Sequence, residues 1–217
     1  MTHVPHGPYE RFFKRPLDLL LSLAACILLS PVFLLLAILI RFKLGSPVLF
    51  TQDRIGRGEN VFRLFKFRSM TDKRGPDGAL LPDEDRLTPF GRALRASSLD
   101  ELPELFNVLK GDMSLVGPRP LLVPYLPYFR DEERIIHSVR GGLLPPDVLA
   151  LRPVFDWDEQ FQREMAYAKR ITFFGDLRIV AATFFVVFVR RHQGGYAQVH
   201  RKSLIATRST PPPEARP

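Results

Sequence analysis

The sequence predicts an α+β protein that is mainly helical and combines a re-entrant N-terminal membrane helix with a small β-hairpin and interfacial amphipathic helices. Three observations predict this fold class. Residues 19–40 form an apolar run of the length that a membrane helix requires. The runs 48–50 and 61–67 are rich in β-prone residues and are separated by a loop that contains glycine. Between residues 87 and 189, several segments have helical periodicity.

The apolar run is interrupted at its centre by Ser30 and Pro31. Proline kinks a helix because it lacks a backbone donor, and the Ser30 hydroxyl can bond a carbonyl of the preceding turn. Basic residues flank both ends of the run, whereas a single span carries them mainly on its cytoplasmic side. We therefore expect residues 11–44 to form a re-entrant anchor that enters and leaves one membrane face. A kinked helix that spans the bilayer is the alternative.

Cys26 follows Leu23-Ala24-Ala25, a sequence that looks like a lipoprotein cleavage site. A secretory signal has an apolar core of about 7–15 residues, followed by a polar mature chain. Here the apolar run continues to Ile40, so we interpret Cys26 as a small core or lipid-facing residue. A single cysteine excludes an intrachain disulfide and agrees with a reducing cytoplasm.

The chain has 217 residues and a formal net charge of +8, which fits one domain and a membrane element. A positive charge can serve nucleic-acid binding, or contact with an anionic membrane surface and phosphorylated ligands. Because nucleic-acid binding does not need an apolar anchor, we expect membrane lipid as a partner and no nucleic acid. Residues 1–10 are expected to form a flexible lead-in, 45–200 a folded domain, and 201–217 a disordered tail.

The two β-prone runs predict a hairpin. Its second strand alternates apolar and basic residues, so Arg63 should lie on the face opposite to Phe62 and Leu64. Residues 71–86 are rich in Gly, Pro and Asp and predict a mobile loop. The acidic run at 83–85 in this loop could bind a metal, but solvation is the usual role of such a run.

Two short helices are expected next, over residues 87–96 and 99–110. Gly111 should end the second of them. Its start has the capping-box spacing Ser98-x-x-Glu101, although Asp100 could equally be the cap because Pro103 must lie in the first turn.

The remainder of the domain should contain an apolar run at 114–116, an irregular segment at 141–156 and two more helices. The first of these helices, 157–170, is polar. The second, 171–189, is strongly apolar, but its uninterrupted part is too short to cross a bilayer. We expect it to pack on the domain or to lie in the membrane interface.

Adjacent carboxylates at a helix start are the first candidates for chemistry. Asp100 and Glu101 follow Arg92 and Arg95, and both the arginines and the helix N-terminus should keep the carboxylates ionised and attract phosphate. One carboxylate could act as a nucleophile and the other as a ligand of Mg²⁺. A role in stabilising the helix dipole is the alternative.

Further cations occur on elements that should be stiff. Lys66 and Arg68 lie in the segment 66–70, at the end of the second strand run, and Arg119 lies between two prolines. The second of these prolines holds Arg119 in an extended conformation, so that its planar guanidinium projects from a stiff loop. Asp156 and Asp158 have the spacing of the aspartate pair of nucleotide-sugar glycosyltransferases, but no strand-rich nucleotide domain precedes them. No histidine has the spacing of a metal ligand.

Five segments together resemble the bacterial sugar transferase family, the small monotopic type of polyprenyl-phosphate phosphoglycosyl transferase. They are residues 14–18 with the Ser30-Pro31 segment, 47–50, 66–70, 98–114 and 115–120. The last two are highly specific, and the resemblance covers residues 11 to about 142 in order. It implies transfer of a sugar 1-phosphate from a UDP-sugar to undecaprenyl phosphate, with Mg²⁺, at the cytoplasmic face of the bacterial inner membrane.

The resemblance also implies roles for particular residues. Asp100 would be the nucleophile that forms a covalent phosphosugar intermediate, and Glu101 would help to hold the metal. Five cations would bind substrate phosphate: Lys66, Arg68, Arg92, Arg95 and Arg119. Residues 45–200 would be the cytoplasmic catalytic domain, an oligomer is possible, and the product would start the assembly of an exopolysaccharide, O-antigen or glycoprotein glycan.

The sequence departs from the family pattern after residue 140. The family commonly has a basic residue followed by Pro-Gly-Ile-Thr-Gly, whereas this chain reads Arg140-Gly141-Gly142-Leu143-Leu144. The departure concerns the sugar and nucleotide contacts and not the phosphoryl chemistry. The chain also lacks the additional N-terminal spanning helices of larger members, so we expect the minimal catalytic form. The alternative functions are those of a non-enzymatic, membrane-anchored basic adaptor and of a glycosyltransferase that releases UDP.

Overall fold

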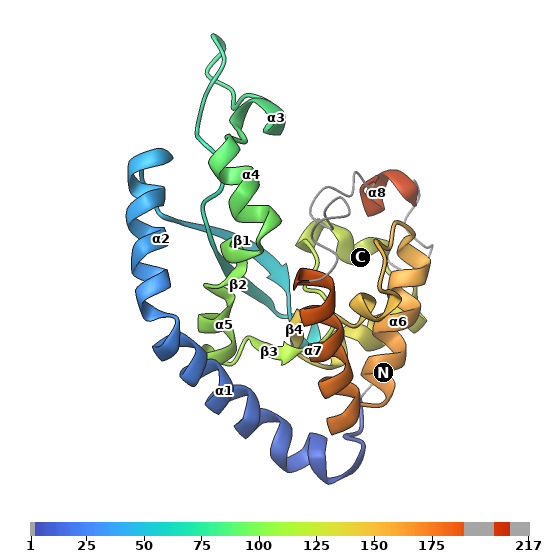
Figure 1. Cartoon of the computed structure of the whole chain (residues 1–217). Coiled ribbons are helices and arrows are strands. Elements are labelled where there is room, and N and C mark those ends of the chain that lie inside the picture. Colours follow the sequence, from blue (N-terminus) through green and yellow to red (C-terminus); the bar gives the residue numbers. More distant parts are fainter. Residues whose placement is uncertain (1–2, 189–201, 209–217) are drawn as a thin grey trace.

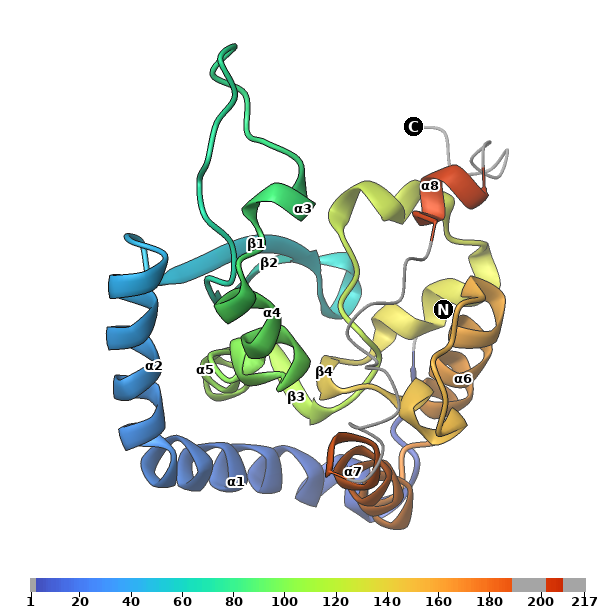
Figure 2. The same cartoon turned by 45° about the horizontal axis from the view of Figure 1, so that its top comes forward.

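The computed structural model describes residues 3–188 and 202–208. Helices α1 (Lys14–Leu28) and α2 (Ser30–Lys43) meet end to end and run along two sides of the molecule (Figures 1 and 2). The hairpin and the short helices of that half lie in the angle between them. The helices α6 (Trp157–Lys169), α7 (Phe173–Phe188) and α8 (Leu204–Thr207) form the opposite half. The fold is α+β and mainly helical, as predicted.

The predicted break in the apolar run is confirmed. A π-helical turn (Tyr9–Phe13) leads into α1, and α1 and α2 are bent by 61° at Leu29. The Ser30 hydroxyl donates a hydrogen bond of 2.8 Å to the carbonyl of Ile27 in the preceding turn. Within the described residues, no single helix is long and apolar enough to cross a bilayer, whereas this bent pair has the required length and composition when both helices are taken together.

Helix α1 carries its polar side chains inside and its apolar side chains outside. Lys14, Asp18 and Ser22 are buried against the domain. The large apolar residues on the outer surface of the helix pair are Leu20, Leu21, Leu23, Ile27, Leu28, Leu34, Leu35, Ile38 and Phe42. An apolar surface of this extent on a folded chain indicates contact with lipid or a partner.

A buried polar network attaches α1 to the domain. Lys14 Nζ donates to a carboxylate oxygen of Asp176 on α7 at 2.7 Å and to the carbonyl of Val116 at 3.1 Å. The hydroxyls of Tyr9 and Tyr167 donate to the same carboxylate at 2.7 and 2.8 Å. The Tyr167 hydroxyl is also 2.9 Å from the carbonyl of Val116, the last residue of β3 (Met113–Val116). The network therefore connects the π-helical turn, α1, α6 and the start of α7 to β3.

The hairpin is confirmed, with a first strand that is longer than predicted. Strand β1 (Leu49–Ile55) pairs antiparallel with β2 (Val61–Phe67). Phe62 and Leu64 are buried while Arg63 is exposed, as the alternating pattern predicted.

The segment 141–156 is not irregular throughout, which corrects the prediction. Strand β4 (Gly141–Leu144) pairs parallel with β3, and a 3₁₀ turn (Pro146–Ala150) follows. Glycine permits this pairing because a Cβ atom at Gly142 would lie 2.0 Å from the backbone nitrogen of Gly117. The sequence did not predict strand β4 because glycine is a poor strand former. The close approach of the two backbones explains why glycine occurs in this strand.

The helices between residues 83 and 110 differ from the predicted ones in detail. Part of the predicted loop forms a short helix α3 (Asp83–Arg86), and α4 (Pro89–Ala96) is capped by Thr88. The predicted helix 99–110 divides into a 3₁₀ turn (Leu99–Glu101) and α5 (Glu104–Lys110).

The predicted capping box at Ser98 is wrong. Ser98 adopts a left-handed conformation with φ 54° and makes no side-chain cap hydrogen bond, because a capping residue needs extended backbone. Gly111 does end α5, with φ 107°.

The C-terminal half has its own core and short helical turns. Turns at Val123–Tyr128 and Asp131–Ser138 precede α6, and Phe129, Phe161 and Leu204 are fully buried between these elements. Within the predicted disordered tail, Leu204–Thr207 form α8, which is held by burial of Leu204 and by ion pairs of Arg208 with Glu133 and Asp158. The rest of that tail, residues 201 and 209–217, lies outside the described residues.

The buried ion pair between α1 and α7 should determine stability. Asp176→Asn keeps the shape of the side chain but leaves Lys14 with only Asp18, at 4.0 Å, as an anionic neighbour in the network. Because an uncompensated buried charge is costly, we expect the free energy of unfolding to fall by about 3 kcal/mol. Chemical unfolding of the detergent-solubilised protein measures this. The control Asp53→Asn, which removes an exposed partner 3.9 Å from Arg63, should change it by less than about 0.5 kcal/mol, and equal losses would contradict the assignment.

Candidate active site

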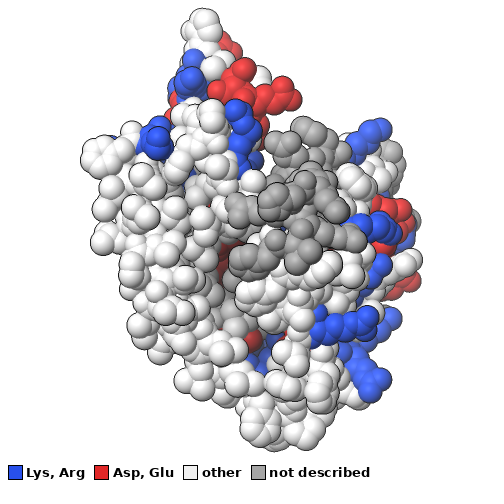
Figure 3. Space-filling view, in the orientation of Figure 1, with Lys and Arg blue, Asp and Glu red and all other residues white. Residues whose placement is uncertain are grey.

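A cavity of about 840 Å³ opens between the hairpin, α4, the Leu99–Glu101 turn and α7. Figure 3 shows it as a central hollow with acidic atoms at its bottom, beside a surface over α1 and α2 that carries almost no charge. The cavity brings together most of the residues predicted from the sequence. Those that line it are Lys66, Arg68, Arg95, Asp100, Glu101 and Arg119.

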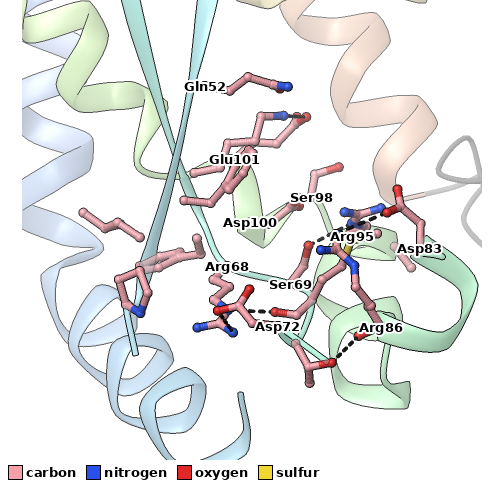
Figure 4. A pocket seen from close by; sticks show the side chains of 18 of the residues that line it. Gln52, Arg68, Ser69, Asp72, Asp83, Arg86, Arg95, Ser98, Asp100 and Glu101 are labelled. Atoms are coloured by element: carbon pink, nitrogen blue, oxygen red, sulfur yellow. Dashed lines mark hydrogen bonds and ion pairs between the residues drawn. The ribbon is translucent and has the colours of Figure 1, made fainter. Parts of the chain in front are cut away.

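The two predicted catalytic carboxylates lie on the 3₁₀ turn between α4 and α5. Asp100 is buried, and Glu101 accepts a hydrogen bond of 2.7 Å from Lys66 Nζ on β2 (Figure 4). Lys66 is also 3.1 Å from an oxygen of Glu104. The ammonium group therefore lies between two carboxylates that are three residues apart on successive turns.

Asn107 fixes the distance between β2 and α5. Its side-chain oxygen accepts from the backbone N–H of Phe65 at 2.9 Å, and its side-chain nitrogen donates to the carbonyl of Arg63 at 2.8 Å. The amide thus pairs with the free edge of β2 as a neighbouring strand would. This contact holds Lys66 opposite Glu101 and Glu104.

The carboxylates differ in their protonation. Burial, and then the charge of Glu101, raise the pKa of Asp100 to about 6, although Lys66 and Arg95 oppose this. For Glu101, burial is outweighed by Lys66 and Arg119, which lower its pKa. A pKa of about 6 leaves Asp100 mainly ionised at neutral pH, but burial exceeds the effect of the cations there, so Asp100 keeps its proton to a higher pH than Glu101 does.

Glu104 is the third carboxylate of the cavity region. Its burial, with the charge of Glu101, raises its pKa to about 7. Sequence reasoning missed this residue, although its three-residue spacing from Glu101 places both on one side of consecutive helical turns.

The predicted phosphate-binding cations have different surroundings. Arg95 donates to the hydroxyl of Ser69 at 2.8 Å and faces the cavity (Figure 4). Arg68 is committed to the chain itself: it donates to the carbonyls of Ser46 and Met70 and pairs with Asp72 at 2.7 Å. Arg92 donates to the carbonyl of Leu87 on the exposed side of α4 and does not line the cavity.

Arg119 reaches the cavity from the loop after β3. Its backbone N–H donates to buried Glu164 on α6 at 3.2 Å. Although desolvation lowers the pKa of Arg119, the charges of Asp147, Glu101 and Glu104 outweigh it and raise that pKa. The Arg119 guanidinium is therefore close enough to Glu101 and Glu104 to feel their charges.

Sequence reasoning also missed Arg54 and Gln52, which line the cavity from β1. Arg54 donates to the side-chain oxygen of Gln52 at 2.8 Å and to the carbonyl of Pro120 at 3.3 Å. The predicted first strand ended at residue 50, so no pattern indicated that these two side chains extend toward the loop after β3 that carries Arg119.

Other candidates have structural roles. Asp156 caps α6 through the N–H of Asp158, and Asp158 pairs with Arg208. Among the described residues, no group of three His, Cys, Asp or Glu could by itself hold a metal. Glu101 and Glu104 nevertheless fit Mg²⁺, which is commonly held by one or two carboxylates plus substrate phosphates, and both already surround one cation, Lys66.

A model of the bacterial sugar transferase family matches residues 9–190 of the chain. The chain is 44% identical over 170 residues to the uncharacterized sugar transferase EpsL of Bacillus subtilis, covering 78% of this chain and 84% of that protein. It is 37% identical over 197 residues to a UDP-glucose:undecaprenyl-phosphate glucose-1-phosphate transferase of Caulobacter vibrioides, with 84% and 74% covered.

A third relative is considerably longer than this chain. It is a UDP-N-acetylgalactosamine-undecaprenyl-phosphate N-acetylgalactosaminephosphotransferase of Aeromonas hydrophila, 36% identical over 185 residues. The match covers 82% of this chain but only 44% of that relative. The chain therefore spans most of its shorter relatives and less than half of this longer one.

The buried charge of Asp100 should cost stability at neutral pH. Its pKa in the folded protein, about 6, lies above the ordinary value of 3.8, so folding becomes less favourable as pH rises from about 4 to about 6. Asp100→Asn cannot ionise and should unfold with a free energy that exceeds the wild-type value by up to about 3 kcal/mol at pH 8. Chemical unfolding at pH 4, 6 and 8 measures the difference, which should vanish at pH 4. A difference independent of pH would contradict a buried charge at Asp100.

Proposed function

Because the chain belongs to the bacterial sugar transferase family, we propose that it transfers a sugar 1-phosphate from a UDP-sugar to undecaprenyl phosphate. The observation that carries this proposal is the convergence of Asp100, Glu101, Lys66 and Arg119 in one cavity beside the apolar helix pair. A soluble nucleotide sugar and a phosphate on a lipid can meet only where such a cavity adjoins a membrane surface. The product would start the assembly of an exopolysaccharide or a related glycan.

The reaction we propose has two displacements at one phosphorus atom. An oxygen of the Asp100 carboxylate attacks the phosphorus that carries the sugar, a bond from carboxylate to phosphorus forms, and the bond to the leaving UMP breaks. A phosphate oxygen of undecaprenyl phosphate then attacks the same phosphorus and releases the Asp100 carboxylate. The raised pKa of Asp100 supports this role, since a poorly stabilised carboxylate is the more reactive nucleophile.

The groups around Asp100 would bind and orient the diphosphate. Arg119 presents a planar fork that suits two phosphate oxygens, with Arg95 and Lys66 as further cations. Mg²⁺ bound by Glu101, with Glu104 beside it, would supply positive charge against the charge of the leaving UMP. In the structure the Lys66 ammonium forms an ion pair with Glu101. When a metal binds that carboxylate, the ammonium would be released and could bind a substrate phosphate.

The bent helix pair would place the cavity at the membrane surface. We propose that residues 11–44 enter the cytoplasmic leaflet of the inner membrane and return to the same face. The 61° bend and the exposed apolar outer surface of α1 and α2 support this. The apolar side chains of α7, among them Phe174 and Phe184, would lie in the interface beside the anchor.

A covalent intermediate is the critical test of this mechanism. The purified protein, mixed with UDP-sugar and Mg²⁺ but without lipid acceptor, should gain the mass of a sugar phosphate and release UMP. Asp100→Asn should abolish both, because an amide cannot form the acyl phosphate, while Glu101→Gln should slow formation of the adduct without removing its attachment point. Intact-protein mass spectrometry measures the adduct. An adduct that persists in Asp100→Asn would place the nucleophile elsewhere, and release of UDP would indicate a glycosyltransferase.

The same assay separates the roles of two arginines. Arg119→Lys keeps the charge but loses the fork, so formation of the adduct should be at least roughly tenfold slower, which is about 1.4 kcal/mol. Arg92→Lys is the matched control, because Arg92 lies outside the cavity, and it should react at the wild-type rate. Equal rates in both variants would leave Arg119 with a purely electrostatic role. If Asp100→Asn and Arg119→Lys both kept full activity, the adaptor function would be favoured.

The topology of the anchor has its own test. In a Cys26→Ala background, a cysteine introduced at Thr2 should be labelled only when a membrane-impermeant thiol reagent reaches the cytoplasmic face. A cysteine at Asp53, on the exposed side of β1, marks the face of the domain. Labelling of the two positions from opposite faces would show a spanning helix.

A further inference from the structure

A second cavity, of about 240 Å³, lies beside the first turns of α1 and shares no lining residue with the catalytic cavity. It is smaller than the pockets of about 300–1,000 Å³ that hold drug-sized ligands. Its walls come from the N-terminal turn, α1, the hairpin turn and the β3 and β4 region. The basic residues that line it are Arg11, Lys14, Arg15, Arg57 and Arg140.

Two of these arginines are held by one short stretch of backbone. Arg15 donates to the carbonyls of Val108 and Met113 at 2.9 and 3.2 Å, and Arg140 donates through Nε to the carbonyl of Gly111 at 2.9 Å. Val108 lies in the last turn of α5, Gly111 directly follows that helix, and Met113 begins β3. The contacts fix both guanidinium groups side by side, while the terminal nitrogens of Arg140 make no hydrogen bond within the described residues.

The remaining arginines of the cavity have no such structural task. Arg57 projects from the turn between the two strands of the hairpin, and its side chain makes no hydrogen bond or ion pair within the described part of the chain. The Arg11 guanidinium lies over the ring of Phe12, 5.5 Å from its centroid, and its side chain makes no hydrogen bond or ion pair with the described residues. Contacts with carbonyls at the end of α5 therefore explain the position of Arg15 and of one nitrogen of Arg140. They do not explain why Arg57, on the hairpin turn, lines the same cavity.

The acidic groups of the cavity are occupied by other partners. Asp18 accepts from the Ser114 hydroxyl and from the N–H of Leu115, and Glu10 accepts from the N–H of His6 and contacts His3. Burial, and then the charges of Arg15 and Arg57, lower the pKa of Arg140. At Arg140 the repulsion from Arg15 and from Arg57 each exceeds the attraction of Asp18, so the three arginines keep an excess of positive charge, which favours binding of an anion.

The position of the cavity indicates which anion it would take. Arg15 precedes the apolar run at Leu19 by four residues, about one helical turn, and Phe12 and Phe13 beside it are 62% and 58% exposed. In the proposed membrane arrangement this is the level of the lipid headgroups. Exposed aromatic rings there can contact acyl chains and glycerol while the arginines face the phosphates.

We propose that Arg15, Arg57 and Arg140 form a binding site for the phosphate of an anionic phospholipid, separate from the catalytic cavity. Arginine suits this ligand because its planar fork can bind two phosphate oxygens at once. A lipid held there would fix the depth of α1 at the point where the chain enters the bilayer. The proposal rests on the membrane anchoring and not on the transfer reaction.

Native mass spectrometry of the full chain in an uncharged detergent tests the site without UDP-sugar. The probes are phosphatidylglycerol, phosphatidylcholine and inorganic phosphate. The wild-type protein should retain one phosphatidylglycerol molecule at concentrations at least roughly tenfold below those needed for phosphatidylcholine. Arg57→Gln should lose most of this preference, and it should fold because the Arg57 side chain makes no hydrogen bond or ion pair with any residue that the structure describes. The matched control is Arg63→Gln, which removes an equal charge from an exposed position on the same hairpin and should retain the wild-type preference.

The outcomes are distinct. Equal retention of phosphatidylglycerol by Arg57→Gln and the wild type would overturn the site, as would an equal loss in Arg57→Gln and Arg63→Gln. Saturation of the wild type by inorganic phosphate at the concentration that phosphatidylglycerol requires would also overturn the assignment to lipid, because it would show a site for the free ion. Formation of the Asp100 adduct is measured separately, so failure of either proposal can be recognised by itself.

Discussion

The buried ion pair between Lys14 and Asp176 determines how the apolar helix pair sits on the rest of the chain. Lys14 also binds the carbonyl of Val116, the last residue of β3, and the loop that carries Arg119 begins immediately afterwards. The same contact that attaches α1 therefore positions the start of the arginine loop. Because a buried charge without a partner is costly, α1 cannot slide or rotate without losing this pair. The cavity that contains Asp100 and Glu101 is thus held at one height relative to the outer apolar surface.

Asp100, Glu101 and the neighbouring buried Glu104 share too few cations for all three carboxylates to be fully stabilised. Lys66 lies between Glu101 and Glu104 and mainly stabilises the charge of Glu101. Asp100 is left with weaker support from Arg95 and Lys66 and with the full effect of burial. The result is a division of roles: one carboxylate that readily stays charged and suits a cation, and one that is a less stabilised and more reactive anion. Asn107 maintains this division because it sets the distance between α5 and β2.

The arginines show how little a residue type says about its task. Arg68 and Arg119 both occur in segments that resemble the family, yet Arg68 binds backbone carbonyls and Asp72, while Arg119 interacts with the charges of Asp147, Glu101 and Glu104. Arg15 and Arg140 support the end of α5 and at the same time line a second basic cavity. What distinguishes these cases is how many donors of the guanidinium group already bind carbonyls or carboxylates of the chain itself.

The sequence by itself determined the break at Ser30-Pro31, the hairpin, helix α6 and the position of Asp100 and Glu101 on one turn, because these follow from proline geometry, residue periodicity and local spacing. The roles of Glu104, Arg54 and Asn107, the β3 and β4 pair, and the raised pKa of Asp100 were decided only by the tertiary structure. Each depends on groups far apart in the chain: the approach of Gly142 to Gly117, the edge of β2 beside α5, and the exclusion of water from a carboxylate. Local sequence cannot encode such distances, since they arise only when separate elements pack together.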